Sequence, residues 1–453
     1  MNQKFPITHH TFKWLENLLS ERFGHSWKIK RTVEGLSLHL PNAGGKILFD
    51  KLYEGFEWAD SDKPCTFWQS ERDGLNSIIK LPLPCFGISN LPSPLIEWQG
   101  RDQIIHYDIL GLIYWMLARV EEIECKSFDL HERIPSESSL AFKHRCLDRP
   151  FVDEWLDMLG QIIKRQWIGI ELKKNQFRLC LSHDVDEPSL YAFKSWSWIA
   201  RVMVAHLVKR KDLKAFFQAP FVKLITQKEL VHDDPYNTFD WLMEVSESNN
   251  IKSVFYFISG KNDTIYDADY EIEHPVIRKL IRQIYERGHE IGLHPSYNSY
   301  KNNKILKDEA EKLKRVCAEE GVIQDKWGAR MHYLQWKQPD TLFSLMEAGI
   351  DYDATLGYAD SPGFRCGTCY EYPAFDAQNQ IELPFRIQPL IVMESSIIGD
   401  SYVALGVNED ALNYMQLFKD RCQAVSGQFR LLWHNSSLFS EETRLMYKMV
   451  VQL

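Results

Sequence analysis

Acidic, basic and imidazole side chains stand at the ends of short apolar segments from about residue 177 onward. Carboxylates and imidazoles activate water, transfer protons and hold divalent cations in enzymes. One such residue at one segment end would be weak evidence, whereas several at the same end of successive segments indicate a shared polar site. These residues are Asp184, Asp186, His294, Arg330, His332 and His434.

The spacing of Asp184 and Asp186 is informative because residues i and i+2 of an extended chain point to the same side. Two carboxylates that face one cavity repel each other unless a cation or an arginine lies close to them. One of the two could bind a metal ion while the other takes a proton from water. A solvated turn at a strand end is the alternative, and for this pair taken alone it is the favoured one.

A regular framework must bring these segment ends together. Seven short β segments, mostly separated by helical patterns, predict a parallel sheet curled into a barrel. In such barrels, the side chains at the carboxyl ends of the strands converge on one face. Pro384 makes the sixth segment an edge or irregular strand, which leaves the closure of the barrel open. The segments are Phe177–Ser182, Ser253–Ile258, Glu290–His294, Trp327–His332, Tyr352–Leu356, Ile381–Phe385 and Phe429–His434.

The first 170 residues follow a different pattern. Alternating segments such as Trp27–Lys30 and Leu36–Leu40 predict strands. Apolar residues at helical spacing between Asp102 and Glu122 predict one helix, and a second is predicted from Val152 to about Gln166. We therefore expect two domains: residues 1–170 form a smaller α+β domain of unknown role, and residues 171–453 form the (β/α) barrel.

Composition excludes some classes of function. The chain has 453 residues, of which 45% are hydrophobic and 25% charged, with a net charge of -9. These values are typical of a globular protein, and without a basic stretch interleaved with aromatic residues we expect no nucleic-acid partner. The first ten residues lack the apolar run of a secretory signal, and no segment has the ~18 consecutive apolar residues that span a bilayer. We expect a cytoplasmic protein.

The nine cysteines are scattered and odd in number, which favours a reducing compartment over a disulfide framework. Only Cys366 and Cys369 have the C-x-x-C spacing. A redox site of the thioredoxin type requires a strand-to-helix turn at this place, and a zinc site requires a second pair elsewhere. Because the sequence offers neither, we expect two ordinary buried or loop thiols.

Three segments in combination resemble the motifs of the polysaccharide deacetylases, also called the NodB-homology or carbohydrate esterase family 4 group. Leu181–Asp186 resembles the first motif, and Gly288–His294 resembles the second, which introduces a metal-binding histidine. Leu431–His434 resembles the last motif, which ends in a catalytic histidine. The segment with Arg330 and Tyr333 is a weaker match to an Arg-x-Pro-aromatic motif. Residues 108–122 with 149–150 resemble the uncharacterised domain that often precedes such barrels.

The resemblance implies a distorted (β/α)7 barrel of the NodB-homology type that hydrolyses the N-acetyl group of a sugar. Such a hydrolysis requires an activated water, a stabilised oxyanion and an acid for the leaving amine. Asp184 would be the general base, paired with Arg330, and His434 would be the acid. Either Asp353 or Asp360 would orient His434.

The resemblance also implies a divalent metal, with zinc as the expected ion, held by Asp186 and His294. The family has a second histidine four residues after the first, and here that position holds Asn298, whose amide oxygen is a weaker zinc ligand. Three outcomes stay open. Asn298 completes a looser site, His332 replaces the missing histidine, or the site binds no metal.

For the substrate we expect a carbohydrate or glycolipid of surface polysaccharide or glycolipid synthesis, contacted by Tyr333, Arg365, Trp433 and Asn435. Two alternatives stay open: a metal-optional amidohydrolase acting on a small non-sugar amide, and a carbohydrate-binding protein without catalysis. The segment Trp198–Lys211 is apolar and then basic, so it could contact a membrane surface, although an internal helix covering the barrel is more common. Nothing in the sequence indicates the oligomeric state.

Overall fold

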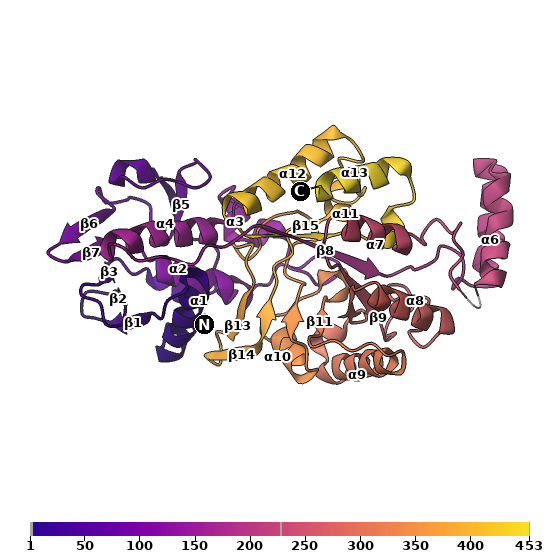
Figure 1. The fold of residues 1–453 in the computed structure, drawn as a ribbon, viewed down its shortest axis with the longest axis horizontal. Helices are drawn as coiled ribbons and strands as arrows, with labels where there is room; N and C mark the ends of the chain where they lie inside the picture. The colour runs from indigo at the N-terminus through magenta and orange to yellow at the C-terminus, as the bar shows by residue number, and fades with distance from the viewer. Residues whose placement is uncertain (1–2, 227–228, 453) are drawn as a thin grey trace.

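The computed structural model describes residues 3–226 and 229–452. Its strands form two main sheets, one in the N-terminal region (residues 3–170) and one in the rest of the chain, which we call the C-terminal region. Helices alternate with most strands of the C-terminal region, and in the N-terminal region they precede and follow the strands, so the structure is a mixed α/β fold. The N-terminal sheet lies at one end of the molecule and helix α6 at the other (Figure 1).

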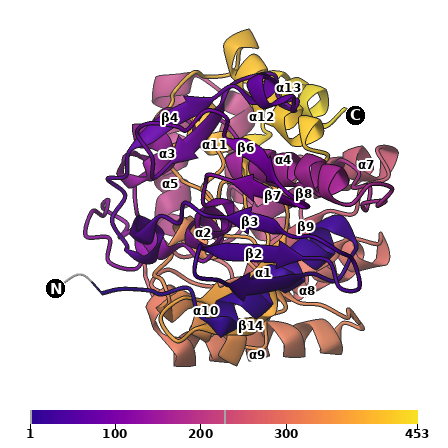
Figure 2. The same ribbon diagram turned by 90° about the vertical axis from the view of Figure 1, so that its left-hand side faces the viewer.

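The N-terminal sheet has five strands in the order β1-β2-β3-β7-β6 and faces the viewer in Figure 2. Neighbouring strands are antiparallel except β3 and β7, and β4 and β5 form a separate hairpin. The elements in chain order are α1 (His9–Phe23), β1 (Lys28–Arg31), β2 (Leu36–His39), β3 (Ile47–Phe49), β4 (Cys65–Trp68), β5 (Leu83–Phe86), β6 (Ile96–Gln99), β7 (Asp102–Ile105), α2 (Ile109–Leu117), α3 (Leu140–Lys143) and α4 (Phe151–Gln166).

The C-terminal sheet has nine strands in the order β13-β14-β12-β11-β10-β9-β8-β16-β15. All neighbours run parallel except β13 and β14. The strands are β8 (Arg178–Val185), β9 (Val254–Ile258), β10 (Glu290–His294), β11 (Gly328–Ala329), β12 (Tyr352–Asp353), β13 (Tyr372–Asp376), β14 (Ile381–Ile387), β15 (Val392–Met393) and β16 (Gln428–Leu432).

Helices connect most of these parallel strands, as a parallel sheet requires. Within the described parts of the chain, none of the helices combines the length and apolar character needed to cross a membrane. The helices are α5 (Trp196–Ala205), α6 (Leu213–Ile225), α7 (Phe239–Ser248), α8 (Pro275–Glu286), α9 (Asn303–Glu319), α10 (Asp340–Glu347), α11 (Glu394–Ile398), α12 (Glu409–Ala424) and α13 (Glu441–Val451).

The seven predicted strands correspond to β8, β9, β10, β11, β12, β14 and β16, which are neighbours in the sheet and parallel throughout. Strands β13 and β15 carry no clear signal in the sequence, because β15 has only two residues and β13 contains Pro373. Strands β13 and β15 are the two edge strands of the sheet, so the sheet is open at these edges.

Pro384 lies in β14, which pairs with β13 on one side and β12 on the other. The predicted edge position is therefore wrong, and the predicted irregularity is present as a register shift opposite Pro373 and Phe375. Residues 383–385 of β14 are not paired with β12 or with β13. Proline is tolerated at 384 because no hydrogen bond of the sheet requires an N–H at this position.

The N-terminal region covers one open edge of the C-terminal sheet. Trp14 of α1 stacks on Phe375 of β13 with 4.9 Å between the ring centroids, and its indole N–H donates to the carbonyl of Pro373 at 2.9 Å. Covering an edge strand in this way prevents it from pairing with another chain. The buried apolar residues of both regions form one continuous core, so the domain boundary near residue 170 stays a prediction.

A buried charge network also joins the two regions. Arg365 donates to both carboxylate oxygens of Glu122, and the same carboxylate accepts from Arg119 at 2.6 Å. Burial raises the pKa of Glu122, but the two guanidinium groups outweigh this effect and lower it to about 2. Cys366, which follows Arg365 in the chain, and Cys369 are buried free thiols, as predicted.

We expect the Glu122→Ala substitution to lower the free energy of unfolding by ~3–5 kcal/mol, because it leaves Arg365 buried without its charge partner. Urea denaturation monitored by circular dichroism measures this loss. The matched control is Glu273→Ala, which removes a half-exposed partner of Arg315 and should cost no more than ~1 kcal/mol. Equal losses in the two variants would contradict a role for the network in joining the regions.

Candidate active site

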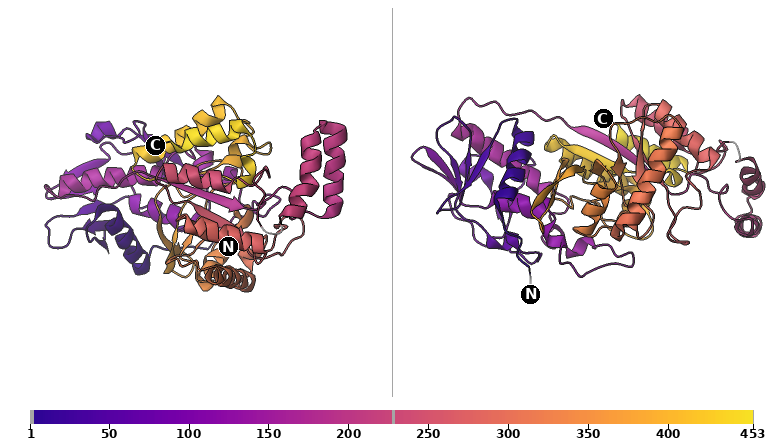
Figure 3. Two further views of the ribbon diagram at one scale, coloured as in Figure 1. Left: turned by 45° about the vertical axis from the view of Figure 1, so that its right-hand side comes forward. Right: turned by 90° about the horizontal axis from the view of Figure 1, so that it is seen from below.

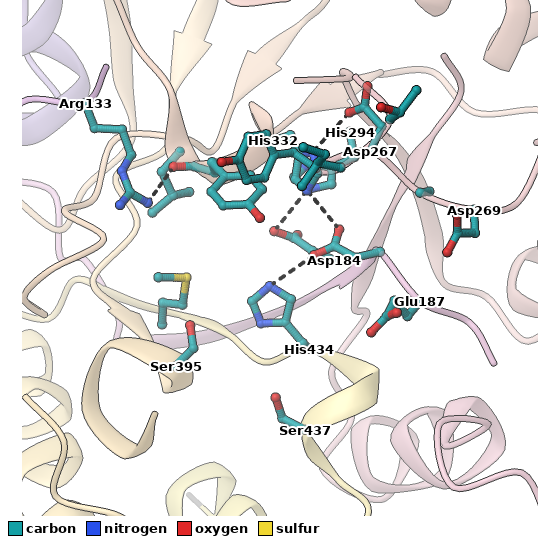
Figure 4. A pocket seen from close by; sticks show the side chains of 18 of the residues that line it. Arg133, Asp184, Glu187, Asp267, Asp269, His294, His332, Ser395, His434 and Ser437 are labelled. Carbon is teal, nitrogen blue, oxygen red and sulfur yellow. Dashed lines mark hydrogen bonds and ion pairs between the residues drawn. The ribbon is translucent and has the colours of Figure 1, made fainter. Parts of the chain in front are cut away.

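The carboxyl ends of four parallel strands deliver polar side chains to one cavity of about 480 Å³. Because these strands are parallel neighbours in one sheet, their carboxyl ends lie along the same side of it. Figure 4 shows the side chains converging from these ends. The predicted residues that line the cavity are Asp184, Asp186, His294, His332, Tyr333 and His434.

Asp184 and Arg330 form a buried ion pair in the floor of this site. The Arg330 Nη1 group donates to Asp184 Oδ1 at 2.8 Å, and both side chains are at most 3% exposed. Arg330 also donates to Ser182 Oγ at 2.8 Å and to the carbonyl of Ala354 at 3.0 Å, so its guanidinium is fixed in place. The other carboxylate oxygen, Asp184 Oδ2, lies 3.7 Å from His294 Nε2.

Three imidazoles surround the carboxylate of Asp186. Its Oδ1 atom lies 3.3 Å from His294 Nε2 and 3.8 Å from His332 Nε2, and its Oδ2 atom lies 3.7 Å from His434 Nε2. Burial raises the pKa of Asp186, but the imidazoles, with His332 first among them, hold it well below its ordinary value. Asp186 is therefore ionised at neutral pH.

The outer ring nitrogens of His294 and His332 face acceptors. His294 Nδ1 donates to the carbonyl of Arg330, and His332 Nδ1 lies 3.5 Å from Asp267 Oδ1. The acceptor at His294 Nδ1 keeps the proton there and leaves the Nε2 lone pair directed at Asp186, whereas His332 Nδ1 makes no hydrogen bond with a described residue. Imidazoles that bind metal ions are held in this way by a carbonyl or a carboxylate.

His434 has a carboxylate partner of its own. Glu394 Oε1 accepts from His434 Nδ1 at 2.7 Å, from the His434 backbone N–H at 3.0 Å and from Ser437 Oγ at 2.9 Å. Burial alone would lower the pKa of His434, but Glu394, Asp186 and Asp184 outweigh it and raise the pKa to about 10.

The residues around Asp186 fit a divalent metal ion. One ligand atom from each of Asp186, His294 and His332 lies within 4.8 Å of the other two. Asp186 Oδ1 is buried and accepts no hydrogen bond from any described residue, although buried acceptors of this kind nearly always have a partner. One carboxylate and two imidazoles are a donor set that suits zinc and related ions.

Asn298 does not line the cavity. Its backbone adopts a left-handed conformation with φ of 66°, and its N–H donates to Gln335 Oε1 at 3.0 Å. Of the residues considered for the missing histidine, the structure brings His332 and not Asn298 to Asp186 and His294.

The prediction that Asp353 or Asp360 orients His434 is wrong. The Asp353 carboxylate accepts from the backbone N–H of Thr355 at 2.9 Å, and burial raises its pKa to about 6. The Asp360 carboxylate accepts from the hydroxyl and backbone of Ser136. Asp353 is thus held by its own loop and Asp360 by the N-terminal region, and the partner of His434 is Glu394, the residue after β15.

Three of the expected substrate contacts lie away from the cavity. Arg365 is buried and occupied by Glu122 and by the carbonyl of Gly357. Trp433 is fully buried, with its ring against Tyr447, and Asn435 donates to two backbone carbonyls inside the protein. Trp433 precedes His434 in an extended segment and therefore points away from the side that His434 faces, whereas Asn435 begins a short 3-10 helix that turns its side chain into the protein.

Sequence reasoning missed Glu394, Asp267 and Arg133. Glu394 directly follows the apolar residues 390–393, so the same rule of a polar residue at a strand end could have found it. Asp267 lies in the loop after β9, and Arg133 reaches the cavity from the N-terminal region. Arg133 donates to the carbonyl of Tyr333 at 3.2 Å and to the Tyr402 hydroxyl at 2.8 Å, and no local pattern signals this long-range contact.

Comparisons with known proteins give weak similarities. Residues 11–168 match the model of a family of unknown function, DUF7033, which corresponds to the N-terminal region. No curated protein sequence matches the chain. Similar solved structures include a putative polysaccharide deacetylase from Mycobacterium smegmatis, with 12% identity, 62% of this chain and 84% of that chain covered, and a TM-score of 0.40.

Two further solved structures are similar to the same extent. A probable polysaccharide deacetylase from Pseudomonas aeruginosa PAO1 has 14% identity, with 61% of this chain and 84% of that chain covered and a TM-score of 0.36. The allantoinase PuuE has 11% identity, with 63% of this chain and 85% of that chain covered and a TM-score of 0.36.

The pairing of His434 with Glu394 predicts a pH dependence of stability in the metal-free protein. The pKa of His434 is raised from its ordinary value of 6.5 to about 10. The protonated ring therefore stabilises the folded protein fully below pH 6.5, and this stability is lost as the pH rises toward 10. We expect Glu394→Gln to remove most of this loss, because the amide carries no charge. Urea denaturation at several pH values between these limits measures the slope.

The matched control for this measurement is Glu97→Gln. Glu97 lies 3.5 Å from His106 Nε2 at a site where its side chain is 47% exposed, so its removal should leave the pH profile unchanged. A wild-type profile that coincides with that of Glu394→Gln would show that Glu394 does not hold the proton on His434.

Proposed function

We propose that this protein is a hydrolase that removes an N-acetyl or other amide-linked acyl group from a sugar or glycolipid. The observation that carries the proposal is that a carboxylate fixed by arginine and an imidazole fixed by a carboxylate line one cavity, on either side of Asp186. Such a pair supplies the base and the acid that amide hydrolysis requires.

Asp184 is the general base in this proposal. Its Oδ1 atom is held by Arg330 at 2.8 Å, and its Oδ2 atom is left to accept a proton from water in the cavity. Arg330 is locked by Ser182 and Ala354, so the carboxylate is held in one orientation. This orientation fixes the direction from which a water molecule attacks.

His434 is the general acid. Glu394 holds its Nδ1 atom and keeps the ring protonated, and its Nε2 atom faces the cavity, where it can protonate the leaving nitrogen. The acid and the base thus have separate partners: Glu394 holds the imidazole of His434, and Arg330 holds the carboxylate of Asp184.

Asp186, His294 and His332 would hold a divalent ion, with zinc as the expected one. When bound, such an ion lowers the pKa of a coordinated water and polarises the acyl carbonyl. The acceptor at His294 Nδ1 keeps that imidazole ready for this role, and Asp267 Oδ1 lies 3.5 Å from His332 Nδ1, where it can take the same part. Asp267 is therefore a positioning residue for His332.

Aromatic rings at the cavity support a carbohydrate substrate. Tyr333 and Tyr266 line it with their ring centroids 5.5 Å apart, and Tyr266 is 37% exposed. Rings with an apolar face and a polar tip can contact both the C–H face and the hydroxyl groups of a sugar. A cavity of about 480 Å³ is of the size that small ligands occupy. We therefore propose Tyr333 and Tyr266 as substrate contacts.

We expect about one zinc ion per chain in protein purified without chelator, and less than about a tenth of that in the His332→Ala variant, because one of three ligands is lost. Elemental mass spectrometry measures the content. The decisive comparison is the Asn298→Ala variant. Asn298 stands where the family's second metal-binding histidine is expected, and its removal should leave the metal bound. Retention in His332→Ala with loss in Asn298→Ala would contradict the assignment.

We expect Asp184→Asn and His434→Ala to lower the rate of acetate release from N-acetylglucosamine oligomers by ~10²–10⁴-fold, as is typical for the loss of a general base or acid. Affinity for the oligomers should stay near that of the wild type. Acetate release and calorimetric binding measure the two quantities on the same protein.

The control for this experiment is Asp269→Asn, which changes a carboxylate of the same cavity that pairs with Lys194 at 2.8 Å. It should keep most of the wild-type rate. Wild-type turnover in His434→Ala would contradict the acid role, and oligomer binding without turnover in the metal-loaded wild type would favour a carbohydrate-binding protein.

A further inference from the structure

The segment between β8 and α7 forms a helical hairpin, which we call the α5–α6 hairpin (residues 196–225). It consists of α5, a π-helical turn at His206–Arg210 and α6. The hairpin stands beside the rest of the molecule at the end opposite the N-terminal sheet (Figures 1 and 3). It thus presents one face to the protein and one to its surroundings.

The inner face of the hairpin is packed and tethered. Ile199 of α5 and Ala219 and Val222 of α6 form a small buried cluster with Tyr191, separate from the main core. Lys223 donates to the carbonyls of Ala192, at 3.2 Å, and Lys194. These contacts hold the two helices together and fix them to the loop after β8.

The outer face of the hairpin is apolar and exposed. Nine of the 27 large hydrophobic side chains that are exposed among the described residues lie here, each between 45% and 66% exposed. Single exposed hydrophobic residues are normal on a protein surface, but such a concentration marks an interaction site. The nine residues are Trp196, Val204, Leu207, Val208, Leu213, Phe217, Phe221, Leu224 and Ile225.

The same segment is strongly basic. Residues 196–226 contain six lysines and arginines and one aspartate, a net charge of +5, within a chain whose net charge is -9. The side chains of Lys209 and Arg210 lie outside the described part of the structure, so they enter only this charge count. The basic residues are Arg201, Lys209, Arg210, Lys211, Lys214 and Lys223, and the acidic residue is Asp212.

We propose that the outer face of the α5–α6 hairpin docks on the surface of an anionic lipid bilayer. Aromatic and aliphatic side chains on exposed helices, combined with lysine and arginine, are typical of helices that lie in the membrane interface. The apolar side chains enter the boundary between headgroups and acyl chains, and the basic residues attract anionic headgroups.

The charge of the hairpin favours a bilayer over a second copy of this chain. Two hairpins packed face to face would bring two segments of charge +5 together, and like charges at an interface oppose association. Anionic lipid headgroups offset this charge instead. The hairpin therefore complements a lipid surface in both its apolar and its electrostatic properties.

The loop that connects β8 to the hairpin lines the cavity. The hairpin follows β8, the strand that carries Asp184, and Glu187 and Lys194 in the connecting loop line the cavity. Docking on a bilayer would bring the cavity to molecules displayed at the lipid surface. The docking itself does not depend on the proposed hydrolysis, because it involves the outer face of the hairpin alone.

The test is co-sedimentation of the full chain with vesicles of phosphatidylcholine alone or of equal parts phosphatidylcholine and phosphatidylglycerol. We expect binding to the anionic vesicles that is at least about tenfold tighter than to the neutral ones and that weakens at high salt. The double variant Phe217→Ser with Leu224→Ser should reduce this binding by about tenfold or more. Lys211→Glu with Lys214→Glu should remove the preference for anionic vesicles.

The matched control is Ile323→Ser with Leu445→Ser, which removes two exposed apolar side chains elsewhere on the protein and should leave vesicle binding unchanged. Thermal unfolding midpoints equal to that of the wild type show that each variant is folded. Absence of wild-type binding to anionic vesicles would overturn the proposal. So would a wild-type dimer in analytical ultracentrifugation that Phe217→Ser with Leu224→Ser makes monomeric, because the hairpin would then bind a second copy.

Discussion

Two carboxylates one residue apart can stay ionised in a single protected cavity only when positive groups offset their charge. Arg330 does this for Asp184 through a direct ion pair, and the imidazole of His434, which Glu394 keeps protonated, lies 3.7 Å from Asp186 Oδ2. Most other features of the site follow from this constraint. The imidazoles need acceptors on their far nitrogens, and the arginine needs acceptors for its remaining N–H groups, so a ring of polar partners surrounds the cavity.

The N-terminal region contributes to this cavity and does not merely accompany the sheet that forms it. Its Arg133 spans the wall of the cavity between Tyr333 and Tyr402, while Trp14 covers the edge strand β13. The buried network around Glu122 ties the two regions through charges that cannot be separated without large cost. An isolated C-terminal region would expose an unpaired sheet edge and lack part of its cavity wall.

The sequence was sufficient to predict the parallel strands and the polar residues at their ends. Both have a local signal, which is an apolar segment followed by a charged or imidazole side chain. Glu394 was missed although it follows the apolar residues 390–393, because the strand before it has only two residues. The sequence was insufficient for Asp267, which approaches His332 through a contact between distant loops. Trp433 was misplaced because motif membership says nothing about which side of an extended chain a residue faces, and Asn435 because it begins a 3-10 helix that the motif does not signal. Long-range contacts and side-chain direction thus account for most errors.

Arg330 holds two residues of the site, Asp184 and His294, with different parts of its structure. Its guanidinium holds Asp184, its carbonyl accepts from the ring of His294, and its own N–H donates to the carbonyl of Leu293 in the adjacent strand. The strand that precedes it, β11, has only two residues. A shift of this short strand would release the carboxylate of Asp184 and rotate the imidazole of His294 in the same movement. The site would therefore lose its geometry as a unit and not one group at a time.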